Sequence, residues 1–207
     1  MPRRRPLIAI VGDTRMKEGG RKWNLAVALS QRLIDESYRI VTGGLGDLPA
    51  AVARGARSSA KYREGDLVAI LPGFDPAEAS GHADIVIATG LDYARNLIVA
   101  NSDAVVAIGG GAGTLSEIAL AWSLKRLVLA YRVPGWSGRL AGKVVDDRPR
   151  ASGTKARVLP VQDERVVSEL LRRLLPQYAK RHRGARVVAR KPPEVRRTEM
   201  SQRLGGV

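Results

Sequence analysis

The segment Gly109–Glu117 combines residue types that could bind a phosphate group. Four glycines fall within residues 109–113, after the apolar run 103–108, which has the length and β-branched content of a buried strand. Downstream, apolar residues at positions 115, 118, 119 and 122 share one helical face. A helix start presents unpaired N–H groups and the positive end of its dipole, and glycines let an anion approach closely. The segment is therefore a candidate phosphate site.

The same residues also fit a purely structural interpretation. The order Thr-Leu-Ser-Glu at positions 114–117 matches the Ser/Thr-x-x-Glu capping box, in which Thr114 caps the helix and Glu117 reaches back to the cap. The glycines would then form only a tight turn. The position of the loop between a strand and a helix favours the phosphate interpretation, and the structural alternative stays open.

A second strand–glycine–helix unit occurs earlier in the chain. The apolar run 39–42 leads into Gly43, Gly44 and a third glycine, and a short helix is expected over 48–56. In an open parallel sheet, two such loops at the carboxyl ends of strands can flank one crevice. The first strand, 7–11, exits through Gly12 toward Arg15, which could reach a phosphate or could be a solvated loop charge.

The alternation of strand and helix patterns predicts one α/β domain. Its expected architecture is a doubly wound, mostly parallel, Rossmann-like sheet with helices on both faces. Residues 133–153 show no periodicity and are expected to be a loop, with a short turn at 134–138. The expected strands are 7–11, 39–42, 66–71, 85–88, 104–108, 127–131 and 156–159, and the expected helices are 21–36, 48–56, 91–101, 115–125 and 161–175.

The charge is concentrated at the two ends of the chain. The formal net charge is +15, to which residues 176–207 contribute nine Lys/Arg and two Glu, and residues 1–6 contribute three Arg. We therefore divide the chain into a basic extension over 1–6, the domain over 7–175 and a basic tail over 176–207. Solvated extensions are the favoured interpretation of the ends, and weak, sequence-independent contact with nucleic acid is the alternative.

Several functional classes are disfavoured by composition. The chain has no cysteine, so disulfides and cysteine–zinc sites are excluded, and with only His82 and His182 no metal centre is expected. No apolar run approaches the roughly 20 residues of a membrane span, and no signal peptide is recognised. A cytoplasmic protein without membrane contact is expected.

Three short segments carry a resemblance to a known family. Tyr93-Ala94-Arg95-Asn96, Ser102-Asp103 and the glycine segment 109–117 resemble the "Lonely guy" superfamily of Rossmann-like proteins, whose signature is Pro-Gly-Gly-x-Gly-Thr-x-x-Glu. Gly109 replaces the proline of that signature, and Asn96 replaces the lysine of its nucleotide-hydrolysing members. With Thr42-Gly43-Gly44, these departures resemble the branch that includes molybdenum cofactor carrier proteins and many uncharacterised nucleotide-binding proteins. The resemblance covers residues 7–175.

The resemblance implies roles for particular residues. Gly110, Gly111, Gly113 and Thr114 match the phosphate-binding loop of the family. Glu117 and Arg95 match the pair that, in the hydrolysing members, cleaves the N-glycosidic bond of a nucleoside 5′-monophosphate. A carboxylate could stabilise the oxocarbenium character that develops on the ribose or activate water, and Arg95 could offset negative charge. In the carrier branch the ligand is instead a pterin with a terminal phosphate.

Three functional hypotheses follow. The first is binding of a phosphorylated nucleotide or pterin, such as molybdopterin, with no other cofactor required. The second is a phosphoribohydrolase that uses Arg95 and Glu117, and the third is nucleic-acid contact through the ends. The candidate ligand-binding residues are Gly12, Arg15, Gly43, Gly44, Arg95, Asn96, Gly110, Gly111, Gly113, Thr114 and Glu117.

The resemblance also implies a homodimer. The helix over 115–125 has a second apolar side at Leu120, Ala121 and Leu124, which calls for a second neighbour. That neighbour is either the equivalent surface of a partner subunit or the helix 91–101 of the same chain.

Overall fold

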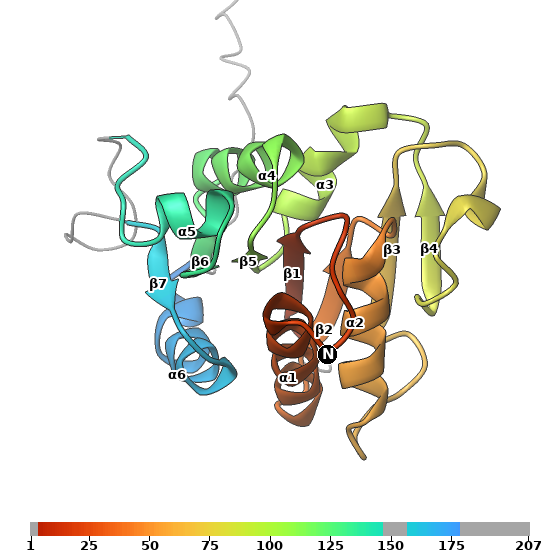
Figure 1. Cartoon of the computed structure of the whole chain (residues 1–207), viewed down its shortest axis with the longest axis horizontal. Coiled ribbons are helices and arrows are strands. Elements are labelled where there is room, and N and C mark those ends of the chain that lie inside the picture. The colour runs from red at the N-terminus through yellow and green to blue at the C-terminus, as the bar shows by residue number, and fades with distance from the viewer. Residues whose placement is uncertain (1–3, 147–156, 179–207) are drawn as a thin grey trace, which may run out of the picture.

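A computed structural model describes residues 4–146 and 157–178, which contain one seven-stranded parallel sheet (Figure 1). Its strands follow the order β4-β3-β2-β1-β5-β6-β7 across the sheet, and all of their pairings are parallel. The predicted doubly wound α/β fold is confirmed. The strands are β1 (Leu7–Gly12), β2 (Arg39–Thr42), β3 (Leu67–Leu71), β4 (Ile85–Ala88), β5 (Ala104–Ile108), β6 (Leu127–Tyr131) and β7 (Leu159–Val161).

Helices cover both faces of the sheet, as predicted. On one face lie α1 (Arg21–Asp35), α2 (Asp47–Arg57) and α6 (Glu164–Leu174), and on the other lie α3 (Asn96–Ala100), α4 (Ala112–Ser123) and α5 (Trp136–Leu140) (Figure 1). Short 3₁₀ turns are η1 (Pro76–Glu78), η2 (Asp92–Arg95) and η3 (Leu175–Tyr178).

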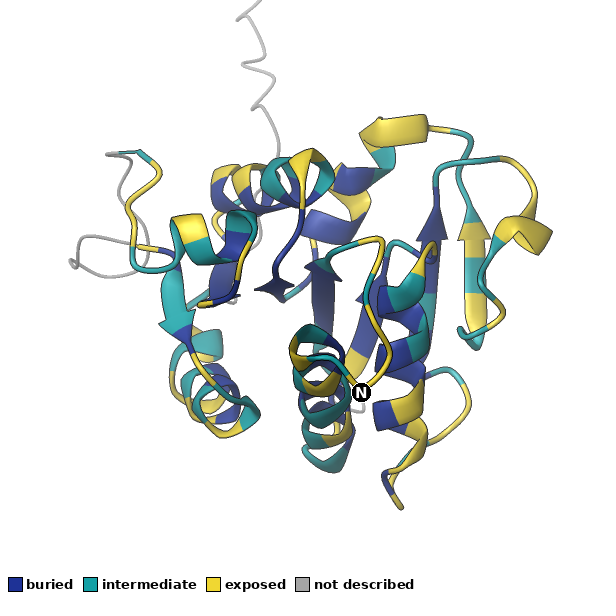
Figure 2. Ribbon diagram, in the orientation of Figure 1, coloured by how far each residue is buried: buried dark blue, intermediate teal, exposed yellow. Residues whose placement is uncertain are grey.

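The central strands divide their side chains between two cores. In β1, Ile8 and Ile10 pack with α1 and α2, whereas Ala9 and Val11 pack with α3 and α4. This alternation follows from the two-residue period of a strand, and both faces are apolar because helices cover both. Figure 2 shows β1, β5 and β6 deeply buried, while β4, at one edge, is largely exposed.

The direction of strand addition reverses at β1. From β1 the chain adds β2, β3 and β4 outward on one side, and it then returns to place β5 against the other side of β1. The loops that leave β1 and β5 therefore diverge to opposite faces of the sheet. In open α/β sheets this reversal creates a crevice at the carboxyl ends of the two strands, where ligands bind.

Several predicted boundaries are wrong. The strand expected at 156–159 is β7 at Leu159–Val161, although residue 156 itself lies outside the described residues. It contains Pro160, which is tolerated because β7 is an edge strand. The expected helix 161–175 begins later, since the Asp163 side chain accepts hydrogen bonds from the N–H groups of Arg165 and Val166 and so caps α6 at Glu164.

Two further differences concern the segments around the glycine loop. Helix α4 begins at Ala112, three residues before the expected start. A five-residue helix, α5, lies in the segment expected to be a loop. It is too short for its periodicity to be visible in the sequence.

Two arginines of the basic N-terminal extension pair with the domain. Arg5 contacts the buried Asp66 carboxylate at 2.5 Å and donates to the carbonyls of Ser37 and Tyr38. Arg4 pairs with Asp103 at 2.7 Å. Arg5 is therefore not the free, solvated charge that was expected, whereas Arg4 is paired but remains largely exposed. The expected nucleic-acid contact through residues 180–203 falls outside the described residues and stays a prediction.

Candidate functional site

A cavity of about 750 Å³ opens at the reversal between β1 and β5. Its floor is the end of β1, and its walls are the loop after β2, the η2–α3 segment and the start of α4. The volume is within the range of small-molecule sites, about 300–1,000 Å³. Within the described residues, no three His, Cys, Asp or Glu side chains gather in a way that could hold a metal ion.

The start of α4 forms one wall and has no capping side chain. Gly111 is the N-cap residue, and no side chain accepts a hydrogen bond from the first turn. The capping-box interpretation is therefore wrong: the buried Thr114 hydroxyl instead donates to the carbonyl of Gly12 in β1, at 3.1 Å. This bond ties the helix to β1 and leaves the first N–H groups of α4 for another acceptor.

Gly109 and Gly110, which precede α4, donate their N–H groups in hydrogen bonds to other residues of the chain. Gly109 N–H donates to the Ser137 hydroxyl and Gly110 N–H donates to the Asp13 carboxylate, both at 2.7 Å. The carbonyls of Gly109 and Gly110 accept hydrogen bonds from the N–H groups of Ser137 and Trp136, at the start of α5. Gly110 has φ +92°, and a Cβ there would lie 2.2 Å from the Thr114 hydroxyl. Gly110 therefore shapes the loop and offers no free donor.

The next two glycines face open space. A Cβ at Gly111 or at Gly113 would meet no atom within 4 Å. Neither residue has a positive φ, so no backbone conformation requires glycine there. Gly113 is moreover inside a helix, where glycine is less favourable than alanine by roughly 0.5–1 kcal/mol. The space next to these two residues lies in the cavity.

Arg95, at the end of η2, lines the same cavity as the start of α4. Its guanidinium lies against Gly43, where a Cβ would come within 2.4 Å of Nη1. That Nη1 is buried and has no hydrogen-bond partner among the described residues. Burial lowers the pKa of Arg95 below its ordinary value, and the charge of Glu117 acts in the opposite direction. A buried cationic donor without an acceptor is costly, and an anion in the cavity would satisfy it.

Glu117 lies one turn into α4 and is 7% exposed. Burial raises its pKa to about 7, and the charge of Arg95 offsets part of that rise. The carboxyl group is therefore near its midpoint of titration at neutral pH, where it could either donate or accept a proton.

Asn96 holds α3 against α4. Its buried amide donates to the Ser116 hydroxyl, which donates to the carbonyl of Gly113, each at 2.7 Å. The expected second neighbour of α4 is thus helix α3 of the same chain. On the second apolar side of α4, Ala121 is fully buried, whereas Leu120 and Leu124 are only partly buried, so the homodimer stays a prediction.

The cavity gathers most of the predicted site residues. Gly44 is not part of its lining and donates its N–H to the Thr42 hydroxyl. Gly110 lies behind the lining, and Arg15 lines a separate cavity. The predicted residues that line the main cavity are Gly12, Gly43, Arg95, Asn96, Gly111, Gly113, Thr114 and Glu117.

The structure adds lining residues that were not among the candidate ligand-binding residues. Asp13 holds the glycine loop, and Asp92 and Tyr93 form the outer rim together with Leu45. Tyr93 is 78% exposed. Its place beside Arg95 in the family motif was a signal that it belongs to the site.

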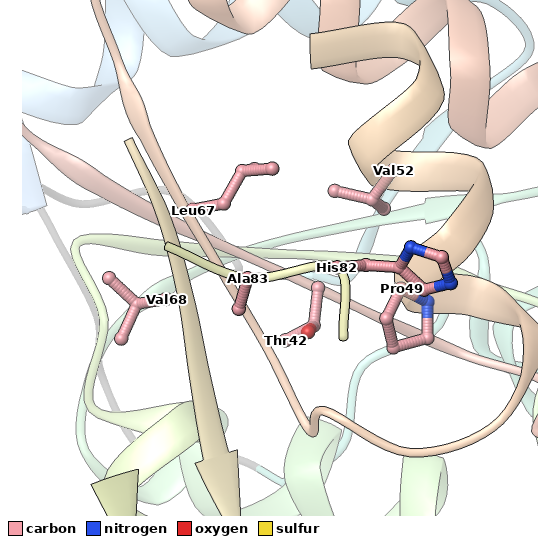
Figure 3. A pocket seen from close by; sticks show the side chains of 7 residues that line it. All are labelled: Thr42, Pro49, Val52, Leu67, Val68, His82 and Ala83. Carbon is pink, nitrogen blue, oxygen red and sulfur yellow. The ribbon is translucent and has the colours of Figure 1, made fainter. Parts of the chain in front are cut away.

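A third, very small cavity lies between α2 and the sheet. Its volume is about 10 Å³, and Figure 3 shows its seven lining side chains, from α2, β2, β3 and the loop before β4. This is at most room for a single water molecule. His82, one of two histidines in the chain, lines this cavity and not the candidate site.

Comparison with known proteins identifies the family. A model described as the SLOG cluster4 family matches residues 5–164. The chain belongs to the SLOG cluster4 family. An uncharacterized protein of Archaeoglobus fulgidus is 36% identical over 113 residues, which cover 54% of this chain and 72% of that protein. The SLOG match includes every element from β1 to β7 and ends at the first residue of α6.

Solved structures with this fold include molybdenum cofactor proteins. The molybdenum cofactor binding protein of Rippkaea orientalis is similar with a TM-score of 0.68 and 29% identity, over 83% of this chain and 98% of that one. The Moco carrier protein of Chlamydomonas reinhardtii is similar with a TM-score of 0.63 and 26% identity, over 84% of this chain and 99% of that one. The resemblance to the Lonely guy-like fold and its carrier branch is thereby confirmed.

The raised pKa of Glu117 predicts a pH-dependent stability. Between about pH 4.5 and pH 7 the folded chain keeps the Glu117 proton while the unfolded chain, with the ordinary pKa of 4.5, releases it. The free energy of unfolding therefore falls as pH rises through this range. Glu117→Gln removes that loss, so its stability relative to wild type should increase with pH, by up to about 3 kcal/mol above pH 7. Urea denaturation at pH 5 to 8 measures the difference.

Asp92→Asn is the matched control, because Asp92 lines the same cavity but is exposed. It should follow the wild-type pH dependence. Parallel stability curves for wild type and Glu117→Gln would contradict the assigned pKa.

Proposed function

We propose that the chain binds a phosphorylated nucleotide or pterin in the main cavity, with the phosphate at the start of α4. One observation carries the proposal. Gly111 and Gly113 stand beside open cavity space at an uncapped helix start, with no conformational or packing reason for glycine inside the chain. A phosphate at this position would accept from the free N–H groups and occupy the space that a Cβ would fill.

The charges around this position support the same ligand. Arg95 supplies a buried Nη1 donor without a partner among the described residues, and it lines the same cavity as the α4 start. The helix dipole adds partial positive charge at the same point. Because Gly109 and Gly110 use their N–H groups on Ser137 and Asp13, we assign the phosphate to the donors that begin at Gly111.

The rest of the cavity suits a planar ring system. Tyr93 and Leu45 provide an aromatic and an aliphatic surface at the rim, and Asn96 provides a polar group. Two similar proteins, at 29% and 26% identity, are a molybdenum cofactor binding protein and a Moco carrier protein. A pterin with a terminal phosphate is therefore the favoured ligand within the class, and a purine nucleotide is the alternative.

Gly113→Ala should increase the stability of the free protein and decrease its affinity for the ligand. Its Cβ meets no protein atom, and alanine should stabilise the helix by about 0.4–1 kcal/mol. The same Cβ would displace the phosphate, so the dissociation constant should rise roughly tenfold or more, which is 1.4 kcal/mol or more. Thermal melts without ligand and titration calorimetry with molybdopterin, AMP and GMP measure the two effects.

Ser123→Ala is the matched control, because it improves helix propensity at the exposed far end of α4 without touching the cavity. It should leave affinity unchanged. Failure of every phosphorylated compound to bind the wild-type chain would overturn the proposed function, and unchanged affinity in Gly113→Ala would remove the phosphate from the α4 start.

Hydrolysis of a nucleoside 5′-monophosphate is a second candidate function, favoured by Glu117. A buried carboxyl group with a pKa of about 7, in one cavity with a buried arginine, suits general acid–base work at neutral pH. On this proposal Glu117 activates a water molecule for attack on the ribose C1′, and the base leaves with a proton. Arg95 contacts the phosphate and orients the nucleotide.

Chromatography of reaction mixtures with AMP, GMP and CMP tests this activity. The wild-type chain should release free base and ribose 5-phosphate, and Glu117→Gln should reduce the rate by about a hundredfold or more. Asp92→Asn, which removes an exposed carboxylate from the same cavity, should retain the activity. Binding of these nucleotides without any release of base would leave the binding function alone.

We also propose a homodimer, through an apolar surface of α3 and β4. Ile85 and Ile87 of β4 lie on the same face of the sheet as Val68 and Ile70, their neighbours in register, and are about half exposed. Leu97 and Ile98 of α3 are 47% and 44% exposed. These four exposed side chains lie on the same side of the sheet and define what we call the α3–β4 surface, and contact with a second copy would remove its apolar area from water.

Light scattering on the full chain tests the assembly. The wild type should have the mass of a dimer at micromolar concentration, and Leu97→Lys should reduce it to a monomer because a charge would be buried at the interface. Val144→Lys places the same charge on another exposed apolar residue and should leave the dimer intact. A monomeric wild type in the presence of ligand would contradict the proposal.

A further inference from the structure

A second cavity, of about 450 Å³, lies on the other side of Asp13 from the main cavity. The loop after β1, the first residues of α1 and the segment after β6 enclose it. Asp13 lines both cavities, so they meet at the carboxyl end of β1. None of the roles assigned to the main cavity uses this second one, which we call the basic cavity.

Four cations line the basic cavity, with one carboxylate. Asp13 is that carboxylate, and it is already bound to Lys22 and to the Gly110 N–H. Within the described part of the chain, the side chains of Arg15, Lys17 and Arg21 have no ion pair or hydrogen bond. The lining thus keeps an excess of three positive charges, which favours an anionic occupant.

The nearest acid of the same loop does not compensate this charge. Glu18 follows Lys17 directly in the sequence, but its carboxylate pairs with Arg54 of α2 at 2.7 Å. It is absent from the lining of the basic cavity. Glu18 therefore does not neutralise the positive charge of the side chains that line the basic cavity.

The first turn of α1 increases the unbalanced charge. Its N-cap is Gly20, without a capping side chain, and the turn contains Arg21 and Lys22 but no acid. Cations at a helix start oppose the helix dipole, and α6 has the usual arrangement with Asp163 and Glu164. An anion in the basic cavity would compensate both the dipole and the cations.

An apolar wall accompanies these charges. Trp23, Met16, Val133 and Pro134 also line the basic cavity, and Trp23 is mostly buried. A cavity lined both by cations and by apolar side chains, among them the indole of Trp23, suits a nucleotide better than an inorganic ion alone.

We propose that the basic cavity is a second subsite for the other half of one ligand, which runs over Asp13 from the main cavity. The ligand class is a pterin or nucleoside joined through a diphosphate to a second nucleoside. This assignment rests on the proposed binding function of the main cavity. Lys22 neutralises Asp13 and lies against Gly109, where a Cβ would come within 2.8 Å of its Nζ. The linking diphosphate therefore passes a neutralised carboxylate.

Two pairs of compounds test the subsite by titration calorimetry on the full chain. In each pair, the one-half ligand would fill only the main cavity, and the two-half ligand carries a second nucleoside, joined through a diphosphate, that would fill the basic cavity. The pairs are molybdopterin with molybdopterin guanine dinucleotide, and AMP with diadenosine diphosphate. In at least one pair, the wild type should bind the two-half ligand about tenfold more tightly or better. Arg15→Ala combined with Arg21→Ala should remove that advantage and leave the affinity for the one-half ligand unchanged.

Arg63→Ala, an exposed arginine outside both cavities, is the matched control and should change neither affinity. Arg21→Glu should raise the melting temperature of the free protein, because an acid at the helix start is favourable, and should weaken only the two-half ligand. A purely structural role of Arg21 would not give this combination.

The outcomes separate the two proposals. Equal affinity for both members of each pair, unaffected by the arginine variants, would overturn the second subsite and leave the main cavity as the binding site. Failure of all four compounds to bind would overturn the proposed function and the second subsite with it.

Discussion

The site depends on the carboxylate of Asp13. It follows β1 directly and accepts the N–H of Gly110, which follows β5, so one hydrogen bond joins the two loops that diverge where the strand order reverses. Lys22 from α1 holds the same carboxylate. Without this contact a buried N–H would lose its acceptor, at a cost of about 1–3 kcal/mol, and the glycine loop would lose its connection to β1. The position of α4 relative to the sheet follows from this bond and from the Thr114–Gly12 bond.

The bond between Asp13 and Gly110 also determines where an anion can bind. A glycine-rich loop is commonly regarded as a row of equivalent donors, but here its first two N–H groups serve the fold and only the later ones face the cavity. Asp13 itself forms part of the wall between the main and basic cavities. One carboxylate thus holds the loop, separates two cavities and limits the free donors to the first turn of α4.

The sequence predicted most of the fold because its central strands are continuous apolar runs. Six of the seven strands lie within one residue of expectation, and β7 was misplaced because Pro160 interrupts a short edge strand. The sequence predicted most of the residues that line the site. It did not predict which glycines hold the loop in place and which face the cavity. Gly110 and Gly111 are indistinguishable in sequence, and only the contacts of Asp13, 97 residues away, separate a structural glycine from a binding one. The capping motif failed for the same reason: Thr114 bonds to β1 and not to its own helix.

The two edges of the sheet differ in a way that bears on the behaviour of the chain at high concentration. At β7 the strand has three residues and includes Pro160, which has no N–H to offer to an incoming strand. At β4 no proline interrupts the strand, and its isoleucines are half exposed. Among the strands that the structure describes, growth of the sheet by an added strand is therefore favoured only on the β4 side. A chain with one blocked edge can pair once, edge to edge, but cannot add further copies indefinitely, so the asymmetry limits such aggregation to closed pairs.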